Sequence, residues 1–382
     1  MNLSDYLSKP NIDLSAVEFS SSHSLAKKIV AFDKETNIEL FDIAILGVPE
    51  DRGSKNIGSA KAPDIIRKKL YSLSDFFPKL KIVDLGNITQ GKKLKDTNVA
   101  IQQVVSQILN TNATLIIIGG TQNITFPCFK AFHHNKKFTN IVSIDSRFDL
   151  GTDDELDLSL NVTKEIIKTH SKYLLDYFNI GYQSYFVSPE DVELLKDKLS
   201  FDSVRLGIAR TQMKNLEPHL RDANLISFDI SSVASSYAQA NIYASPNGFT
   251  GDEACQISKY AGLSDNANVF GIFEINPDLD NNEQTSLLAA QMIWYFFEGF
   301  SNRRKEEITL INNNIQKYIV KLENEYSIVF YKSIVTERWW IEIPYQKIKN
   351  RHLIIACSED DYINATNHEI PDRWLKAFQK IN

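Results

Sequence analysis

Cysteine is scarce in this sequence, and so are long apolar runs and clustered basic residues. The three cysteines, Cys128, Cys255 and Cys357, are too few for a disulfide framework and too far apart for a CxxC metal site. The most apolar stretch, Leu287–Phe297, is well short of the roughly 20 residues that span a membrane, so it predicts a buried helix. The net charge is -6 and Lys and Arg are scattered, which disfavours nucleic-acid binding. Because no secretory signal follows Met1, we expect a cytoplasmic protein that binds neither nucleic acid nor a membrane.

The usual nucleotide and hydrolase motifs are also missing. No GxGxxG follows the first apolar run, and no GxSxG is present, so neither a dinucleotide site nor a serine hydrolase is indicated. Gly53 and Gly58 have the spacing of a phosphate loop, but Ser59 and Ala60 stand where its Lys and Ser/Thr belong. None of the seven histidines lies in a motif at the end of a predicted strand.

Short apolar runs separated by stretches long enough for a helix recur through the first three quarters of the chain. Runs of this kind, rich in Ile, Leu and Val, are typical of strands buried on both faces. Strand and helix in alternation predict a parallel sheet with helices on both sides, an α/β fold. The predicted strands are Ile43–Val48, Ile82–Leu85, Leu115–Ile118, Ile141–Ile144, Phe178–Tyr182, Val204–Ala209, Leu225–Phe228 and Val269–Ile275.

The composition divides the chain into three parts. Residues 1–40 are weakly patterned and are expected to form an N-terminal arm, whereas 41–300 carry the α/β pattern. Residues 301–382 are expected to form a small α+β appendage packed on the main domain. Its expected elements are a helix over Lys305–Leu322, strands at Tyr326–Phe330 and Trp339–Ile343, a further apolar run at Leu353–Ala356 and a last helix around Trp374.

Acidic residues follow several of the predicted strands. Asp145, Asp149, Asp229 and Glu274 all come at or just after the end of a strand, and such ends meet at one edge of a parallel sheet. Crowded carboxylates cannot all stay ionised without a cation, so this edge is a candidate metal site. The alternative is that each is an ordinary turn or cap residue, as most aspartates in loops are.

Motifs at the strand ends resemble, in order, those of the ureohydrolase family of arginase, agmatinase and, most closely, formimidoylglutamase. The motifs are Gly47–Pro49, Ala62–Arg67, Gly119–Gln122, Ser143–Asp149, Ser227–Ser231, Pro246–Glu253 and Glu274–Pro277. The resemblance implies a three-layer α/β/α sandwich around an eight-stranded, mainly parallel sheet. It also implies two manganese ions, held by two histidines and four aspartates, that activate a bridging hydroxide to attack an amidine or guanidine carbon.

The same resemblance shows which ligand positions depart from the family. Asp145, Asp149 and Asp229 match three of the aspartates, whereas Gln122 and Arg147 replace the histidines and Ser231 replaces an aspartate. Asp145, Asp149, Asp229 and Gln122 are therefore expected to hold at most a single divalent cation, Mn, Mg or Ca, or none, and a two-manganese cluster is not expected.

Arg147 and Ser231 are interpreted as residues that replace a metal. The hypothesis is that the guanidinium of Arg147 lies between Asp145 and Asp229; the alternative is that Arg147 points to solvent. By resemblance, Glu274 and Asp145 are the candidate catalytic residues, and Asn247 and Glu274 are the candidate substrate-binding residues.

Three functions remain open. The first is a pseudoenzyme of this family that binds a small nitrogenous ligand or has a structural role. The second is an active hydrolase of linear C–N bonds in amidine, guanidino or formimino groups, using one metal or none. The third is an assembly module that contacts a partner through Trp339, Trp340 or Trp374, unless these pack against the main domain. The resemblance also implies a homo-oligomer.

Overall fold

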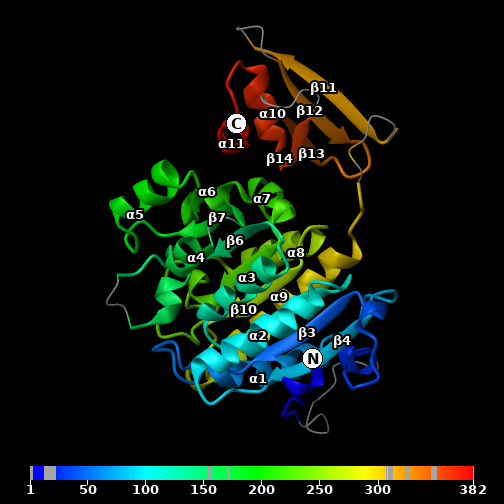
Figure 1. The fold of residues 1–382 in the computed structure, drawn as a ribbon, viewed down its shortest axis with the longest axis vertical. Helices are drawn as coiled ribbons and strands as arrows, with labels where there is room; N and C mark the ends of the chain where they lie inside the picture. The colour runs from blue at the N-terminus through cyan, green and yellow to red at the C-terminus, as the bar shows by residue number, and fades with distance from the viewer. Residues whose placement is uncertain are drawn as a thin grey trace.

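The main body of the molecule is built on one large sheet with parallel strands at its centre (Figure 1). The computed structural model describes residues 3–12, 23–152, 156–170, 173–306, 308, 313–322, 327–345 and 351–381. Its strand order is β1-β4-β3-β5-β10-β9-β6-β7-β8, and β2 also pairs with β4. The strands are β1 (Leu7–Ser8), β2 (Val30–Ala31), β3 (Ile43–Val48), β4 (Ile82–Ile88), β5 (Thr114–Gly119), β6 (Thr139–Ile144), β7 (Leu174–Tyr182), β8 (Asp202–Arg205), β9 (Leu225–Asp229) and β10 (Val269–Phe273).

Helices cover both faces of this sheet. Successive strand residues point to opposite faces, so Ile116 packs with the layer that contains α1, α8 and α9, and Ile117 packs with the layer of α2, α3 and α4. The helices are α1 (Ala62–Ser72), α2 (Leu94–Ile108), α3 (Thr125–His134), α4 (Val162–His170), α5 (Pro189–Glu193), α6 (Leu206–Thr211), α7 (Glu217–Asp222), α8 (Gly251–Leu263) and α9 (Gln284–Ser301). The expected three-layer α/β/α sandwich around a mainly parallel sheet is therefore confirmed. Among the described residues the sheet has ten strands rather than the expected eight, because the short strands β1 and β2 both pair with β4.

Two strand predictions in this sheet need correction. The predicted strand Val204–Ala209 ends at Arg205, and Leu206 begins helix α6, because the chain leaves the sheet edge at its last parallel strand. The predicted strand Val269–Ile275 ends at Phe273, since Glu274 has a positive φ of 67° that an extended strand does not allow. The apolar stretch Leu287–Phe297 is buried within α9, as predicted.

A second, antiparallel sheet of order β11-β12-β13-β14 lies at one end of the molecule (Figure 1). Its elements are β11 (Ile315–Lys321), β12 (Ser327–Ser333), β13 (Trp339–Pro344), β14 (His352–Cys357), α10 (Glu359–Thr366) and α11 (Asp372–Ile381). A helix was predicted over Lys305–Leu322, but residues Ile315–Lys321 form strand β11, so the prediction is wrong for that part. Residues 307 and 309–312 lie outside the described residues, as does Tyr326 of the next predicted strand. The boundaries at 40 and 300 remain predictions.

The three tryptophans of the C-terminal part of the chain each make a defined packing contact. Trp339 is buried and stacks on Tyr362 of α10 with ring centroids 4.6 Å apart, and the indole N–H of Trp374 donates to the carbonyl of Glu342 at 3.0 Å. Trp340 lies under the guanidinium of Arg221. Trp340 thus contacts the main domain, as the packing alternative expected, whereas Trp339 and Trp374 pack within the C-terminal part of the chain. The assembly role stays a prediction.

The C-terminal sheet contacts the main body at the amino ends of the large sheet's strands. Arg221 on α7 donates to the carbonyls of Trp339 and Cys357, and Lys380 on α11 pairs with Asp176 near the start of β7. Parallel strands that begin here end at the opposite edge, where the acidic motifs lie. Across the described part of the chain, no helix is both long and apolar enough to cross a bilayer.

Candidate functional site

Four neighbouring strands bring the predicted site residues together. The strands β5, β10, β9 and β6 are adjacent in that order, and their carboxyl ends carry Gln122, Glu274, Asp229 and Asp145 respectively. The register aligns these ends, because Ile118 pairs with Ile272 and Phe273 pairs with Asp229. All four side chains are buried, with exposed fractions between 1% and 7%. The strand-end prediction therefore identified residues that are far apart in the sequence and adjacent in the fold.

Glu274 is held in place on both carboxylate oxygens. Its Oε1 accepts the backbone N–H of Gln122 at 2.7 Å, and its Oε2 accepts the side-chain amide of Asn56 at 2.9 Å. The positive φ of Glu274 is sustained by its own N–H, which donates to the carbonyl of Gly120 at 2.7 Å. Burial raises the pKa of Glu274 to about 7, although these two donors oppose the shift. Asn56 was missed by the sequence reasoning, since nothing in its loop marks it.

Gln122 directs its amide nitrogen into the sheet. Its Nε2 donates to the hydroxyls of Ser143 and Ser227, each at 3.4 Å, which come from strands β6 and β9. Its carbonyl oxygen, Oε1, is buried and has no hydrogen-bond partner among the described residues. A buried acceptor without a donor is costly unless a proton donor or a cation approaches it.

The aspartates use one oxygen each for the local backbone. Asp145 accepts the N–H of Arg147 at 2.8 Å through Oδ1, and Asp229 accepts the N–H of Ser231 at 2.6 Å. The other oxygen of Asp145, Oδ2, is buried and has no donor at hydrogen-bonding geometry within the described ranges, although the side chains of Asp149 and Gln122 lie close enough to lower the pKa of Asp145. Asp145 and Asp229 therefore do act as turn or cap residues, as the alternative interpretation expected. This role uses only one oxygen of each carboxylate.

The buried carboxyl groups raise one another's pKa values. Burial raises the pKa values of Asp149 and Asp229 well above the usual aspartate range, and the neighbouring carboxylates of Asp145 and Glu274 raise them further. Burial also raises the pKa of Asp145. A cluster of this kind binds protons, or a cation in their place, more readily than exposed carboxylates do.

Arg147 does not lie between the two acids. Its guanidinium carbon is 4.2 Å from the ring centre of Phe186 and 5.7 Å from that of Tyr243, and no ion pair joins it to Asp145 or Asp229. The side chain is half-buried rather than fully in solvent. Its charge still lowers the pKa of Asp145, but this influence is the weakest of those acting on that carboxyl. Neither the bridging position nor the solvent-facing alternative describes Arg147, which is held by aromatic rings that sequence reasoning missed.

The remaining position, Ser231, is neutral and buried. Its hydroxyl lies 3.5 Å from that of Ser146. Within the described part of the chain, no three His, Cys, Asp or Glu side chains are arranged to hold a metal ion. The oxygen donors present, three carboxylates and one amide, are of the type that a hard divalent cation prefers, whereas the histidine nitrogens expected for a manganese pair are missing.

A buried aspartate not singled out from the sequence ties the surrounding loops together. Asp157 accepts hydrogen bonds from the hydroxyls of Ser54, Ser159 and Tyr243, and from the backbone N–H of Lys55. These donors lower its pKa against the opposing effect of burial, so it stays ionised. The network fixes Tyr243, and with it one of the two rings around Arg147.

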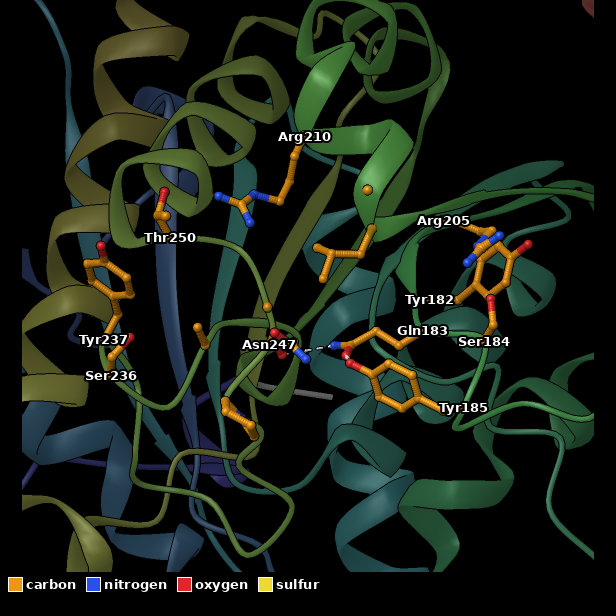
Figure 2. Close-up of a pocket in the computed structure, with 15 residues that line it drawn as sticks. Tyr182, Gln183, Ser184, Tyr185, Arg205, Arg210, Ser236, Tyr237, Asn247 and Thr250 are labelled. Atoms are coloured by element: carbon orange, nitrogen blue, oxygen red, sulfur yellow. Dashed lines mark hydrogen bonds between the residues drawn. The ribbon is translucent and has the colours of Figure 1, made fainter.

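Asn247 lies in a pocket beside the acidic cluster rather than in it. The pocket has a volume of about 440 Å³, and the backbone carbonyl of Asn247 accepts the side-chain amide of Gln183 at 3.1 Å on its floor (Figure 2). Gln183 is joined to the segment Asp145–Asp149, since the backbone N–H of Gln183 donates to the carbonyl of Ser146 at 2.9 Å. Of the two candidate substrate-binding residues, Asn247 lines this pocket, whereas Glu274 is buried and does not line it.

Comparison with known proteins agrees with this architecture. A model of the arginase family matches residues 41–298. Formimidoylglutamase from Staphylococcus haemolyticus is 27% identical over 267 residues, covering 66% of this chain and 85% of that protein. Mitochondrial guanidino acid hydrolase from Homo sapiens is 26% identical over 282 residues, covering 68% and 78% respectively.

Solved structures show the same fold. Formimidoylglutamase from Bacillus subtilis superposes with a TM-score of 0.67 at 19% identity, covering 77% of this chain and 97% of that one. Trypanosoma cruzi formiminoglutamase, solved with Mn²⁺, superposes with a TM-score of 0.64 at 21% identity, covering 70% and 96%.

Proposed function

Because this chain belongs to the arginase family and is close to the formimidoylglutamases, we propose that it has lost two-manganese hydrolysis and binds a small nitrogenous ligand at the retained acidic cluster. The observation that carries the proposal is the side-chain set at the six positions that the resemblance assigns to metal ligands. Three are Gln122, Arg147 and Ser231, so the site offers no imidazole and one carboxylate fewer than a manganese pair needs.

The second metal position is the more altered. Arginine cannot lose its proton in a protein and so cannot ligate a metal, and the guanidinium of Arg147 is turned onto Phe186. Ser231 supplies a neutral hydroxyl in place of a carboxylate. In the family, the metal pair supplies an activated hydroxide. These residues do not fit the pair, and losing that chemistry should cost several kcal/mol of transition-state stabilisation.

What remains is a buried cluster of hydrogen-bond acceptors. Asp145 and Gln122 each have a buried oxygen without a partner among the described residues, and Asp149 and Asp229 add carboxylates beside them. Such oxygens accept N–H groups of an ammonium, amidinium or guanidinium, or coordinate a single hard cation. Binding of a cationic nitrogen group is therefore retained in our proposal, while turnover is not.

Metal analysis of the purified full chain, with manganese titration and assays on formiminoglutamate, guanidino acids and arginine, tests the proposal. We expect no more than one equivalent of bound manganese and no hydrolysis. The control is the variant Gln122→His/Arg147→His/Ser231→Asp, which restores the family's ligand set and should bind two equivalents. Two tightly bound equivalents in the unaltered chain, together with hydrolysis, would refute the proposal.

A second function stays open, namely hydrolysis with one metal or none. It is favoured by Glu274, which is buried, oriented by Asn56 and Gln122, and has its pKa raised to about 7. A carboxyl with such a pKa is suited to proton transfer near neutral pH. If metal-depleted protein hydrolysed formiminoglutamate and Glu274→Gln abolished the activity, this function would replace the first.

A further inference from the structure

A second cavity lies where the C-terminal part of the chain meets the main body, at the opposite edge of the large sheet from the acidic cluster. Its walls are the first residues of β6 and β7, the segment 198–202, part of α7, strand β14 and helix α11. We call it the interface cavity. Its volume of about 680 Å³ is within the range of small-molecule sites, which are common at junctions between structural units.

Apolar side chains from both sides line the interface cavity. Leu174, Phe178 and Phe201 are buried residues of the main body, and Leu353 and Ala377 face them from β14 and α11. A ligand that covers such side chains gains free energy in proportion to the apolar surface that it removes from water. The walls therefore favour a ligand with an apolar body.

The charged residues that line the interface cavity are already paired. The ion pairs are Asp176–Lys380, Asp202–Lys376, Asp222–Arg373 and Lys198–Glu193, with N–O distances between 2.5 and 3.3 Å. A charged ligand would lose its hydration here without gaining an unpaired counter-charge. The interface cavity therefore favours an uncharged ligand.

His219 adds a hydrogen-bond donor to the wall. Its Nδ1 lies 2.6 Å from Nη1 of Arg373, which can only donate, so the hydrogen of the neutral ring is on Nε2. Burial, with the charges of Arg373 and Lys376, lowers the pKa of His219 well below its usual value and keeps the ring neutral. His219 lines the cavity and is partly exposed, and no described residue accepts a hydrogen bond from Nε2.

Strand β14 adds main-chain groups, because it is the outermost strand of its sheet and turns its free edge to the main body. The N–H of Ala356 donates to Asp222 at 3.0 Å, and the carbonyl of Ala356 accepts from Nε of Arg373 at 2.5 Å. Alternate residues of an antiparallel strand direct their main-chain groups to the same edge, so the N–H and carbonyl of Ile354 point the same way. Ile354 lines the cavity, and among the described residues none bonds to these two groups.

We propose that the interface cavity binds a small, uncharged, mainly apolar molecule that carries an amide group. The amide carbonyl accepts from the N–H of Ile354 or from Nε2 of His219, and the amide N–H donates to the carbonyl of Ile354, as an added strand does at a sheet edge. The proposal goes beyond the proposed function, because no residue of the acidic cluster lines the cavity. Its C-terminal walls also lie outside residues 41–298, which the arginase-family model matches.

The test is titration of the full chain, followed by NMR, with N-acetyl-L-phenylalaninamide, which is uncharged. We expect saturable binding. N-acetyl-L-phenylalanine, an anion, and L-phenylalaninamide, a cation, keep the same ring and should bind about tenfold more weakly or worse, since the cavity has no unpaired charge for them. No saturable binding of the neutral amide, or equal binding of either charged form, would overturn the proposal.

Ile354→Pro locates the binding at the edge of β14. Proline removes an N–H that no described residue accepts, and edge strands tolerate it. We expect Ile354→Pro to weaken binding about fivefold or more, because the ligand loses a hydrogen bond. The control Ile354→Val keeps the N–H and should bind as the unaltered chain does. Thermal unfolding of both variants checks the fold, and equal affinities in the two would contradict the proposal.

Leu175 provides a second test that does not touch β14. Its side chain lines the cavity and is 51% exposed, so the fold should tolerate a polar residue there. Leu175→Asn should weaken binding about threefold or more through lost apolar contact, whereas Leu40→Asn changes an exposed leucine outside the cavity and should have no effect. Equal effects of the two would refute the proposal even if Ile354→Pro failed to fold. Manganese content and hydrolysis are measured separately, so failure of one proposal leaves the other testable.

Discussion

The guanidinium of Arg147 stacks on the ring of Phe186, with its central carbon 4.2 Å from the ring centre, and so turns away from the carboxylates that flank it in the sequence. The backbone N–H of Arg147 nevertheless donates to Asp145. One residue thus stabilises the acidic loop through its main chain while its charge is held by an aromatic ring.

The stacking predicts a measurable coupling between Arg147 and Phe186. In a double-mutant cycle of Arg147→Gln and Phe186→Leu, we expect a coupling free energy of about 0.5–2 kcal/mol, the usual worth of a cation over an aromatic face. Urea unfolding of the four proteins gives this value. A coupling indistinguishable from zero would mean that the guanidinium lies elsewhere in solution, and the bridging hypothesis would regain support.

His219 predicts a pH dependence of stability. It is stacked on Phe178 with ring centroids 3.6 Å apart, and its Nδ1 lies 2.6 Å from Nη1 of Arg373. Because arginine can only donate, Nδ1 must accept, which requires a neutral ring. Burial, with the charges of Arg373 and Lys376, lowers the pKa of His219 well below its usual 6.5.

Acidification should therefore weaken the fold. Below pH 6.5, His219 is protonated in the unfolded chain but stays neutral in the native protein. The free energy of unfolding therefore falls by about 1.4 kcal/mol per pH unit until the pKa of native His219 is reached. Asp149 and Asp229, with raised pKa values, act in the opposite direction, so the useful quantity is the difference from His219→Gln, which cannot titrate. Parallel pH profiles for the two proteins would contradict the prediction.

Arg373 should stabilise the docking of the C-terminal sheet far more than a neighbouring lysine does. It donates to the carbonyl of Ala356 at 2.5 Å and to Asp222 and His219 at 2.6 Å each. Arg373→Ala should lower the free energy of unfolding by about 2–4 kcal/mol, because one buried and two partly buried acceptors lose their donor. Lys380→Ala breaks a more exposed pair and should cost about 0–1 kcal/mol. Equal losses in denaturant titrations would count against the arrangement at this interface.

Replacing Gly120 or Gly207 with alanine should have opposite effects on stability, because the space for a Cβ differs at the two positions. A Cβ on Gly120 would lie 2.0 Å from the carbonyl oxygen of Glu50, which is backbone and cannot rotate away. Gly120→Ala should therefore destabilise by about 2 kcal/mol or more and disturb the neighbouring contact between Gln122 and Glu274. Gly207→Ala, in helix α6 with open space around it, should be neutral or stabilise by about 0.5–1 kcal/mol. Thermal unfolding of both variants is the measurement, and a tolerated alanine at 120 would be the contrary result.

The sequence was most informative where burial dictated the pattern. Strands such as Thr114–Gly119 are continuous runs of apolar residues because helices cover both of their faces, and the acidic loops follow from where such strands end. The prediction failed at the edge of the large sheet. The segment 206–209 is as apolar as a buried strand, but it forms part of helix α6. Helix α10 was missed, although Ser358 and Asp361 form a capping box that marks its start.

Side-chain direction was beyond reach of the sequence. The six ligand positions could be assigned by resemblance, but the orientation of Arg147 depends on Phe186 and Tyr243, which come from separate loops. Tyr243 in turn depends on Asp157. Such long-range contacts leave no local pattern, so a residue type at a known position did not reveal what its charge contacts.

The C-terminal sheet and the acidic cluster occupy opposite ends of the same strands, since Asp176 lies near the start of β7 and Asp145 follows the end of β6. A fluorescent label on helix α11 would therefore report whether the C-terminal sheet is docked on the main body, without blocking the pocket that Asn247 lines.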